Sequence, residues 1–206
     1  MEKFTHITAS ACPLPAENID TDQILPARYL KLPRKGEHGK VLFQDLRFDA
    51  TGKERPDFPL NRAPWQDAKI IVGGRNFGGG SSREAAVYAL FDYGIRCVIA
   101  PSFGDIFSQN ATKNGLLTAV VSEAESGTLI AALTHEPTLL VSVDLEAETI
   151  TCGELRYRFA IDPARQTRLL NGWDDIDVTA SFQDQIGAFK AANLKWRPWV
   201  VPSRTI

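Results

Sequence analysis

A glycine-rich stretch that ends in two serines and an arginine carries the side chains best suited to chemistry. Residues 73–86 read GGRNFGGGSSREAA. The relevant positions follow one another in the order Gly78, Gly79, Gly80, Ser81, Ser82 and Arg83. Glycines let the backbone approach a ligand closely because they have no Cβ. Backbone N–H groups at a helix start attract anions. The loop is therefore suited to binding a polyanionic small molecule and to lowering the pKa of a serine hydroxyl.

An ordinary structural role explains some of the same residues. Ser81 and Glu84 have the spacing of a capping box, with which many helices begin. Taken alone, the loop leaves the structural and the functional interpretation open. Two nucleotide-binding patterns do not match: no lysine follows the glycines, and the sixth position counted from Gly78 is Arg83 rather than glycine.

Composition and charge argue against several classes of protein. The chain has 206 residues, a formal net charge of −2 and 44% hydrophobic residues. The small net charge and the lack of any block of like charges argue against nucleic acid as a partner. No apolar run approaches the roughly 18 residues that span a bilayer, and the N-terminus has no apolar signal core. We expect a cytoplasmic protein with neither a membrane nor a nucleic-acid partner.

The cysteines and histidines are too scattered to form a metal site. They are Cys12, Cys97, Cys152, His6, His38 and His135. None of them has the spacing of a metal or iron–sulfur ligand set. Cys97 lies in an apolar strand, where we expect a small buried hydrophobic residue. We predict that this chain binds no metal ion or cluster by itself.

Strands and helices are predicted to alternate in the middle of the chain. Strands are expected at 3–9 (ended by Pro13 and Pro15), 69–73, 95–100 and 116–121, and helices at 82–93, 103–114 and 125–135. This alternation predicts an α/β fold with a mostly parallel sheet. Three later segments, 138–145, 149–152 and 154–159, alternate apolar and polar residues and predict an antiparallel meander.

Two stretches do not fit the alternation. Residues 31–66 are rich in proline, glycine and charge and predict a long functional or disordered loop. Helices are expected at 163–171 and 177–193. We predict one domain over 1–206 with a C-terminal extension from about residue 194, whose two tryptophans fit either docking on another surface or packing on the chain's own core.

Several motifs together resemble a known family. They are NIDTDQILPARYL at 18–30, RNFGGGSSRE at 75–84, YG at 93–94 and VIAPSFGDIF at 98–107. In this order they resemble the small subunits of 3-isopropylmalate dehydratases, which correspond to the swivelling β/β/α domain of the aconitase family. The resemblance extends from about residue 3 to about residue 193.

The resemblance implies a division of labour between two chains. A separate large subunit would hold a [4Fe–4S] cluster with its own cysteines, and this chain would close over it. The reaction would be the reversible loss and re-addition of water on a hydroxy-dicarboxylic acid. In leucine biosynthesis this converts 2-isopropylmalate into 3-isopropylmalate through isopropylmaleate.

The resemblance also implies roles for the side chains of the loop. Ser81 would be the base: as an alkoxide it would take a proton from the carbon beside a carboxylate. The loop N–H groups, the helix start and Arg83 would have to stabilise that anion. Ser82 and Arg83 would bind substrate carboxylates, because a guanidinium meets a carboxylate with two parallel hydrogen bonds. Arg34 would be a further substrate-binding arginine, or else a solvated loop charge.

The acidic turn would lie at the same site. Asp22 would orient the loop or the arginine, with an Asx turn as its structural alternative. Thr21, Gly79 and Gly80 would shape the loop around the base.

The resemblance also implies which residues would select the substrate, and the chain departs from the family at two positions. Tyr29, Leu30 and Lys31 open the loop that helps to select the substrate's side chain, and Leu30 would contact an isopropyl group. Family members often have cysteine where this chain has Gly79, and histidine where it has Ala85. Two alternatives therefore stay open: the small subunit of a maleate or citraconate hydratase, and a non-catalytic anion-binding module.

Overall fold

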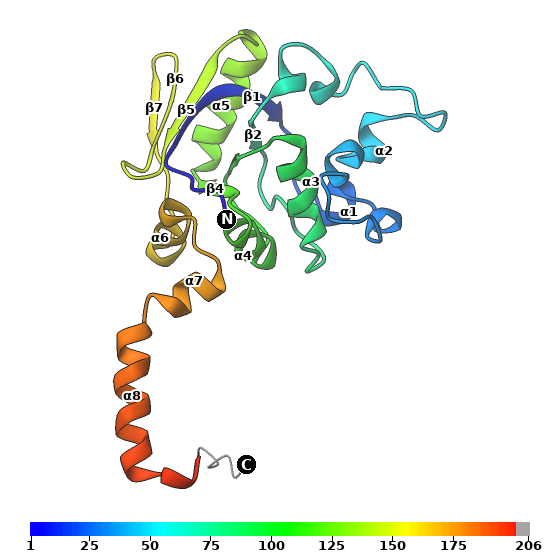
Figure 1. Ribbon diagram of the computed structural model, residues 1–206. Coiled ribbons are helices and arrows are strands. Elements are labelled where there is room, and N and C mark those ends of the chain that lie inside the picture. The colour runs from blue at the N-terminus through cyan, green and yellow to red at the C-terminus, as the bar shows by residue number, and fades with distance from the viewer. Residues whose placement is uncertain (201–206) are drawn as a thin grey trace.

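A seven-stranded mixed sheet forms the centre of the protein (Figure 1). The computed structural model describes residues 1–200. Its strands are β1 (His6–Leu14), β2 (Ile70–Gly73), β3 (Cys97–Ala100), β4 (Leu117–Val120), β5 (Leu140–Asp144), β6 (Thr149–Cys152) and β7 (Leu155–Arg158). They lie in the order β4-β3-β2-β1-β5-β6-β7. The pairs from β4 to β1 are parallel and those from β1 to β7 antiparallel, which confirms the predicted α/β class and the predicted meander.

The first strand differs from the one predicted at residues 3–9. It runs from His6 to Leu14 and includes Pro13, which was expected to end it. Residues 6–10 pair with β5, whereas residues 11–14 pair with β2. At Pro13 one side of the strand is consequently an edge, where a residue without an N–H group is tolerated. The long β1 thereby joins the parallel and antiparallel parts of the sheet.

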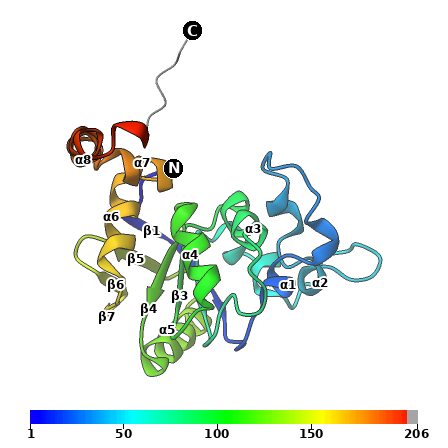
Figure 2. The ribbon, with the colours of Figure 1, turned by 90° about the horizontal axis from the view of Figure 1, so that it is seen from below.

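Helices cover both faces of this sheet, as Figures 1 and 2 show. They are α1 (Thr21–Ile24), α2 (Gln44–Arg47), α3 (Ala85–Tyr93), α4 (Asp105–Lys113), α5 (Glu123–His135), α6 (Pro163–Asn171), α7 (Asp175–Ala180) and α8 (Gln183–Trp196). One hydrophobic core lies between the sheet and α1, α3 and α4. A second core lies between the opposite face and α5 and α6. Gly94 ends α3 at a φ of 115°, as the sequence predicts for a helix stop.

The stretch at 31–66 is built from short helical turns. Besides α2 it contains the 3₁₀ turns His38–Val41 and Pro59–Asn61. Leu42, Phe43 and Leu60 are buried in the same core as α3. The stretch therefore covers one face of the sheet rather than forming a disordered loop.

The single helix predicted at 177–193 is wrong. Asp174 caps α7 through a capping box, α7 ends at Ala180, and α8 starts anew at Gln183. The break falls at Ser181, just after Val178 and Thr179, which both have low helix propensity, and Ala180. No residue of α8 is buried, and the helix points away from the domain (Figure 1). The part of the predicted extension beyond residue 200 lies outside the described residues.

No helix within residues 1–200 combines the length and the apolar character that crossing a membrane requires.

Candidate functional site

The acidic turn and the glycine loop, far apart in sequence, run side by side. The Ile19 carbonyl accepts a hydrogen bond of 2.7 Å from the Gly78 N–H, and the Gly79 carbonyl accepts one of 2.9 Å from the Thr21 N–H. Asp20 and Gly79 form a parallel bridge between the two segments. The backbone therefore clamps the two predicted motifs into one site at the end of β2.

Thr21 fixes the backbone of Ser81 and leaves the serine hydroxyl free. The buried Thr21 Oγ1 accepts from the Ser81 N–H at 3.2 Å and donates to the Ser81 carbonyl at 3.4 Å. Asn110 Nδ2 donates to the Ser82 carbonyl at 3.3 Å. Both serines are exposed, and neither hydroxyl has a hydrogen-bond partner within residues 1–200. Two hydroxyls are thus presented to whatever covers this loop.

Arg83 is held by Asp22. Its Nη1 donates to Asp22 Oδ1, which also accepts from the Ala27 N–H at 2.9 Å. These two hydrogen bonds, that from Arg83 first, lower the pKa of Asp22 below its ordinary value of 3.8. A lowered carboxylate pKa means that the pair is intact above the ordinary value and is lost only as the pH falls through the lowered one. The pair therefore stays ionised throughout the neutral range, and Asp22 contacts both the arginine and the turn that begins at Ala27.

The helix after the loop begins three residues later than predicted. It starts at Ala85, and Glu84 at its N-cap makes no side-chain cap hydrogen bond. The capping box between Ser81 and Glu84 is therefore wrong; Glu84 Oε1 accepts from Asn114 Nδ2 at 2.8 Å instead. Residues 82–83 instead make contacts outside the helix: Asn110 donates to the Ser82 carbonyl, and the Arg83 side chain donates to Asp22.

The late start of α3 leaves donors open around the serines. Within the described chain, the N–H groups of Ser82, Arg83, Glu84 and Ala85 have no hydrogen-bond acceptor. Open N–H groups ahead of a helix form a site for an anion. Together with the guanidinium, they can hold a carboxylate and stabilise negative charge on a neighbouring oxygen.

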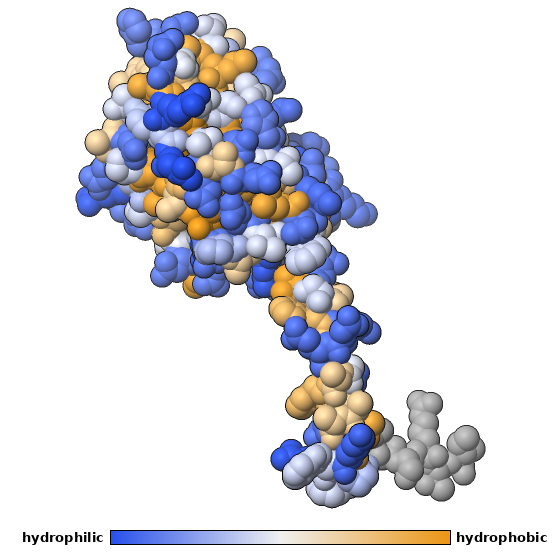
Figure 3. Space-filling view, turned by 90° about the vertical axis from the view of Figure 1, so that its left-hand side faces the viewer, coloured by the Kyte–Doolittle hydropathy of each residue, from blue (hydrophilic) through white to orange (hydrophobic). Residues whose placement is uncertain are grey.

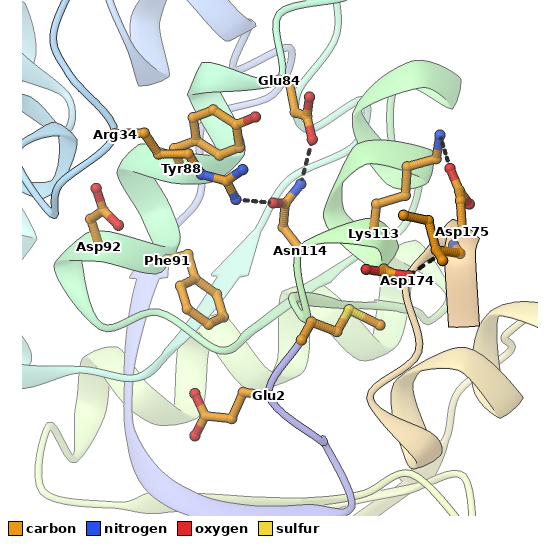
Figure 4. A pocket seen from close by; sticks show the side chains of 12 residues that line it. Glu2, Arg34, Glu84, Tyr88, Phe91, Asp92, Lys113, Asn114, Asp174 and Asp175 are labelled. Atoms are coloured by element: carbon orange, nitrogen blue, oxygen red, sulfur yellow. Dashed lines mark hydrogen bonds and ion pairs between the residues drawn. The ribbon is translucent and has the colours of Figure 1, made fainter. Parts of the chain in front are cut away.

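Arg34 lies in a neighbouring hollow of about 690 Å³ rather than on the serine loop (Figure 4). Its guanidinium stacks 3.9 Å from the centre of the Tyr88 ring, and Nη2 donates to Asn114 Oδ1 at 2.6 Å. Asn114 in turn donates to Glu84, the residue after Arg83. The structure therefore joins Arg34 to the end of the loop through Asn114 and packs it on Tyr88.

The expected specificity residues follow directly on Asp22. The hydrogen bond from the Ala27 N–H to Asp22 fixes the 3₁₀ turn Ala27–Tyr29. Tyr29 is half-buried against the core, whereas Leu30 is 41% exposed and Lys31 is exposed. Leu30, which directly follows this turn, is therefore a large apolar side chain that is free to meet a ligand.

Comparison with known proteins decides the family. A model of the aconitase C-terminal domain family matches residues 1–124. A 3-isopropylmalate dehydratase small subunit from Rhodospirillum centenum is 49% identical over 203 residues, covering 98% of this chain and 100% of that protein. The chain belongs to the 3-isopropylmalate dehydratase small-subunit family. The 3-isopropylmalate dehydratase small subunit from Rhodospirillum rubrum is 44% identical to this chain, and the alignment covers 100% of both proteins.

A solved structure supports the same assignment. The crystal structure of 3-isopropylmalate dehydratase from Methanocaldococcus jannaschii superposes with a TM-score of 0.63 at 26% identity. The match covers 90% of this chain and 99% of that one. The predicted aconitase-type fold is confirmed.

The cysteines of this small-subunit-family chain are structural. Cys12, Cys97 and Cys152 are all buried and unpaired. Burial raises the pKa of each thiol and so disfavours the thiolate that metals bind. Within residues 1–200, no three His, Cys, Asp or Glu side chains lie together in a way that could hold a metal ion.

Several asparagines of the site were missed by sequence reasoning. Asn18 and Asn76 each have a φ of 56°, and Asn76 Nδ2 donates to Asn18 Oδ1 at 2.9 Å across the two segments. Asparagine is enriched in this left-handed region, but the sequence does not say which asparagines adopt it.

Sequence reasoning also missed the capping box that Asp20 forms with Gln23, although the spacing of these two residues was a signal for it.

The family's glycines are not equivalent in this chain. Gly78 has a φ of 73°, and a Cβ there would lie 2.2 Å from the Phe107 ring. Gly79 has no positive φ, and a Cβ there would first meet the end of the Asn76 side chain, at 3.0 Å. Cysteine, frequent at this position in the family, thus needs only a small shift of Asn76.

We expect Gly78→Ala to lower the free energy of unfolding by at least about 2 kcal/mol, because backbone strain and overpacking add. Gly79→Ala, the matched control, should stay within about 1 kcal/mol of the wild type. Urea unfolding of the three proteins measures the difference. Equal losses for both variants would contradict the described loop geometry.

Proposed function

We propose that this chain is the small subunit of a 3-isopropylmalate dehydratase, a hydro-lyase of leucine biosynthesis. The observation that carries the proposal is its 49% identity, over nearly the full length of both chains, to a protein of that name. The site agrees with it: a free serine hydroxyl, an arginine and open N–H groups suit a substrate with two carboxylates.

The base in this proposal is Ser81. A serine hydroxyl is a very weak acid, so several pKa units of stabilisation are needed, at about 1.4 kcal/mol each. The open N–H groups before α3 and the Arg83 guanidinium are the sources of positive charge that this chain supplies. No acidic or basic side chain of the described residues is hydrogen-bonded to the hydroxyl, and in this proposal a partner supplies the rest of the site.

The remaining positions bind and orient. Ser82 and Arg83 would hold substrate carboxylates, and Asp22 and Thr21 would keep the arginine and the serine in place. Arg34 would reach substrate only if the turn that carries it moves from Asn114 toward the loop. Gly79 and Gly80 would let the backbone of the loop approach the substrate closely, because they carry no side chain.

The partner in this proposal is a large subunit with a [4Fe–4S] cluster. The three buried cysteines here do not fit as cluster ligands, so we assign the cluster to the large subunit's own residues. Bound there, the cluster would act as a Lewis acid on the substrate's hydroxyl and carboxylate.

The test is a comparison of substrates in the reconstituted enzyme. This chain is mixed anaerobically with the large subunit of the same organism and offered 2-isopropylmalate, citraconate and maleate. Ultraviolet absorbance of the unsaturated acid reports turnover. We expect 2-isopropylmalate to give the highest kcat/KM. A preference for citraconate or maleate would favour the hydratase alternative, and binding of carboxylates without turnover would favour the anion-binding module.

Leu30→Ala tests the specificity turn. Because Leu30 is the exposed apolar side chain there, its loss should raise the KM for 2-isopropylmalate by about 10- to 100-fold, as removal of a few methyl groups from a pocket does. The smaller acids should be affected much less. Lys35→Ala, an exposed change nearby, is the control. An unchanged substrate ranking would remove Leu30 from the specificity role.

A further inference from the structure

The C-terminal arm, residues 182–200, exposes apolar surface that its own domain does not use. It comprises α8 and the 3₁₀ turn Pro198–Val200, and Figures 1 and 3 show it leaving the domain. Phe189 is 69% exposed, Trp196 84% and Trp199 74%. Large apolar side chains gathered on one exposed element mark an interaction surface.

Most of the large apolar side chains of the arm's helix lie on one face. Phe182 at the N-cap, Ile186, Phe189 and Trp196, with the polar Asn193 between the last two, follow each other at alternating spacings of four and three residues, whereas Leu194 lies off this face. This spacing places them along one face of the helix. The stripe therefore has the pattern of a helix that lies with one face in a groove.

We propose that this arm anchors the chain in an apolar groove of the large subunit. The existence of that subunit rests on the function proposed above. The arm is not an appendage peculiar to this chain, because the alignment with the Rhodospirillum rubrum small subunit covers all of both proteins. A feature shared with a small subunit is suited to a role in assembly.

The base of the arm is continuous with the surface that the large subunit must cover. Asp175 at the start of α7 pairs with Lys113 at 3.1 Å. Asp175 and Ile176 line the same hollow as Arg34 and Glu84, and Glu84 directly follows Arg83 (Figure 4). A partner that closes over the serine loop and this hollow would therefore also cover the start of α7, the helix that leads into the arm.

A second copy of this chain is less suited than the large subunit to cover the apolar face of the arm. Helix α8 has 14 residues, or two heptads, fewer than the three to four sustained heptads that indicate a coiled coil. Trp199 lies beyond the helix and would stay outside such a pair. In a groove, the side chains of Phe189, Trp196 and Trp199 would bury roughly 450–750 Å² at about 150–250 Å² each. That is a large share of the roughly 800 Å² that one partner contributes to a stable interface.

The experiment measures binding separately from turnover. The full chain and the double variant Phe189→Ser/Trp196→Ser are titrated into the intact large subunit by calorimetry under anaerobic conditions. We expect the Kd to rise at least about 100-fold, as for the loss of two interface hot spots. At saturating concentration, kcat should stay within about twofold, because the arm touches no reacting atom. The control Asp184→Ala/Lys195→Ala changes the opposite face of α8 and should leave the Kd within about threefold.

The outcomes distinguish a failure of the docking proposal from a failure of the proposed function. Equal affinities for the wild type and the double variant would overturn the docking proposal, even if the complex converts 2-isopropylmalate. A tight, arm-dependent complex that converts none of the three acids would support docking and contradict the function. Sedimentation of the chain alone should give a monomer. A dimer that the double variant dissociates would overturn the proposal in favour of self-association.

Discussion

Ser81→Ala will lower kcat of the assembled enzyme by about 1,000-fold or more, the upper part of the range for loss of a general base. The physical reason is that the Ser81 hydroxyl is exposed, has no partner within the described chain and is held in place only through its backbone by Thr21. Steady-state kinetics with saturating small subunit measures the loss.

The same geometry predicts that the variant folds normally. Because the Ser81 hydroxyl makes no hydrogen bond within residues 1–200, its removal should change the free energy of unfolding by less than about 0.5 kcal/mol. Ser82→Ala is the matched control: the side chain is equally exposed, but its loss should act mainly on KM. Near-normal turnover of Ser81→Ala would remove this serine from the role of base.

Arg83→Ala will lower kcat/KM by about 150- to 20,000-fold, since two charged hydrogen bonds to a substrate carboxylate contribute about 1.5–3 kcal/mol each. Arg83→Lys should recover only part of the loss, because an ammonium group cannot make the paired contact. The comparison of KM and kcat for both variants separates substrate binding from chemistry.

A second arginine of the loop provides the control. Arg75 also forms an ion pair, with Glu17 at 2.7 Å, but both side chains are more than half exposed. An exposed pair contributes about 0–1 kcal/mol, so Arg75→Ala should leave the kinetics nearly unchanged. If Arg75→Ala and Arg83→Ala cost the same activity, general electrostatics rather than carboxylate binding would explain the loss. Because the pKa of Asp22 is lowered, the Asp22–Arg83 pair should add no pH dependence between about pH 6 and 9.

Much of the fold was predictable because its signals are local. The strand before the glycine loop, the stop of α3 at Gly94 and the antiparallel meander each follow from residues within a few positions of the element. The two motifs that form the site were also identified, although nothing in the sequence says that their backbones pair. The roles of Ser81 and Arg83 in catalysis stay predictions.

The features that sequence reasoning missed depend on distant contacts. The start of α3 is delayed because Asp22 and Asn110, remote in sequence, hold residues 82–83. Pro13 is accepted in β1 because the strand changes partners just before it. Arg34 is placed by Tyr88 and Asn114, across a stretch whose path no local pattern specifies.

The most direct test of the central claim is a titration of this chain into a fixed amount of the large subunit with an intact cluster, with 2-isopropylmalate as substrate. Each chain alone should be inactive, and the rate should rise from near zero to a plateau as the small subunit is added. A large subunit that turns over by itself, or a plateau at zero with an intact cluster, would contradict the claim that this chain supplies the Ser-Ser-Arg loop to a shared active site.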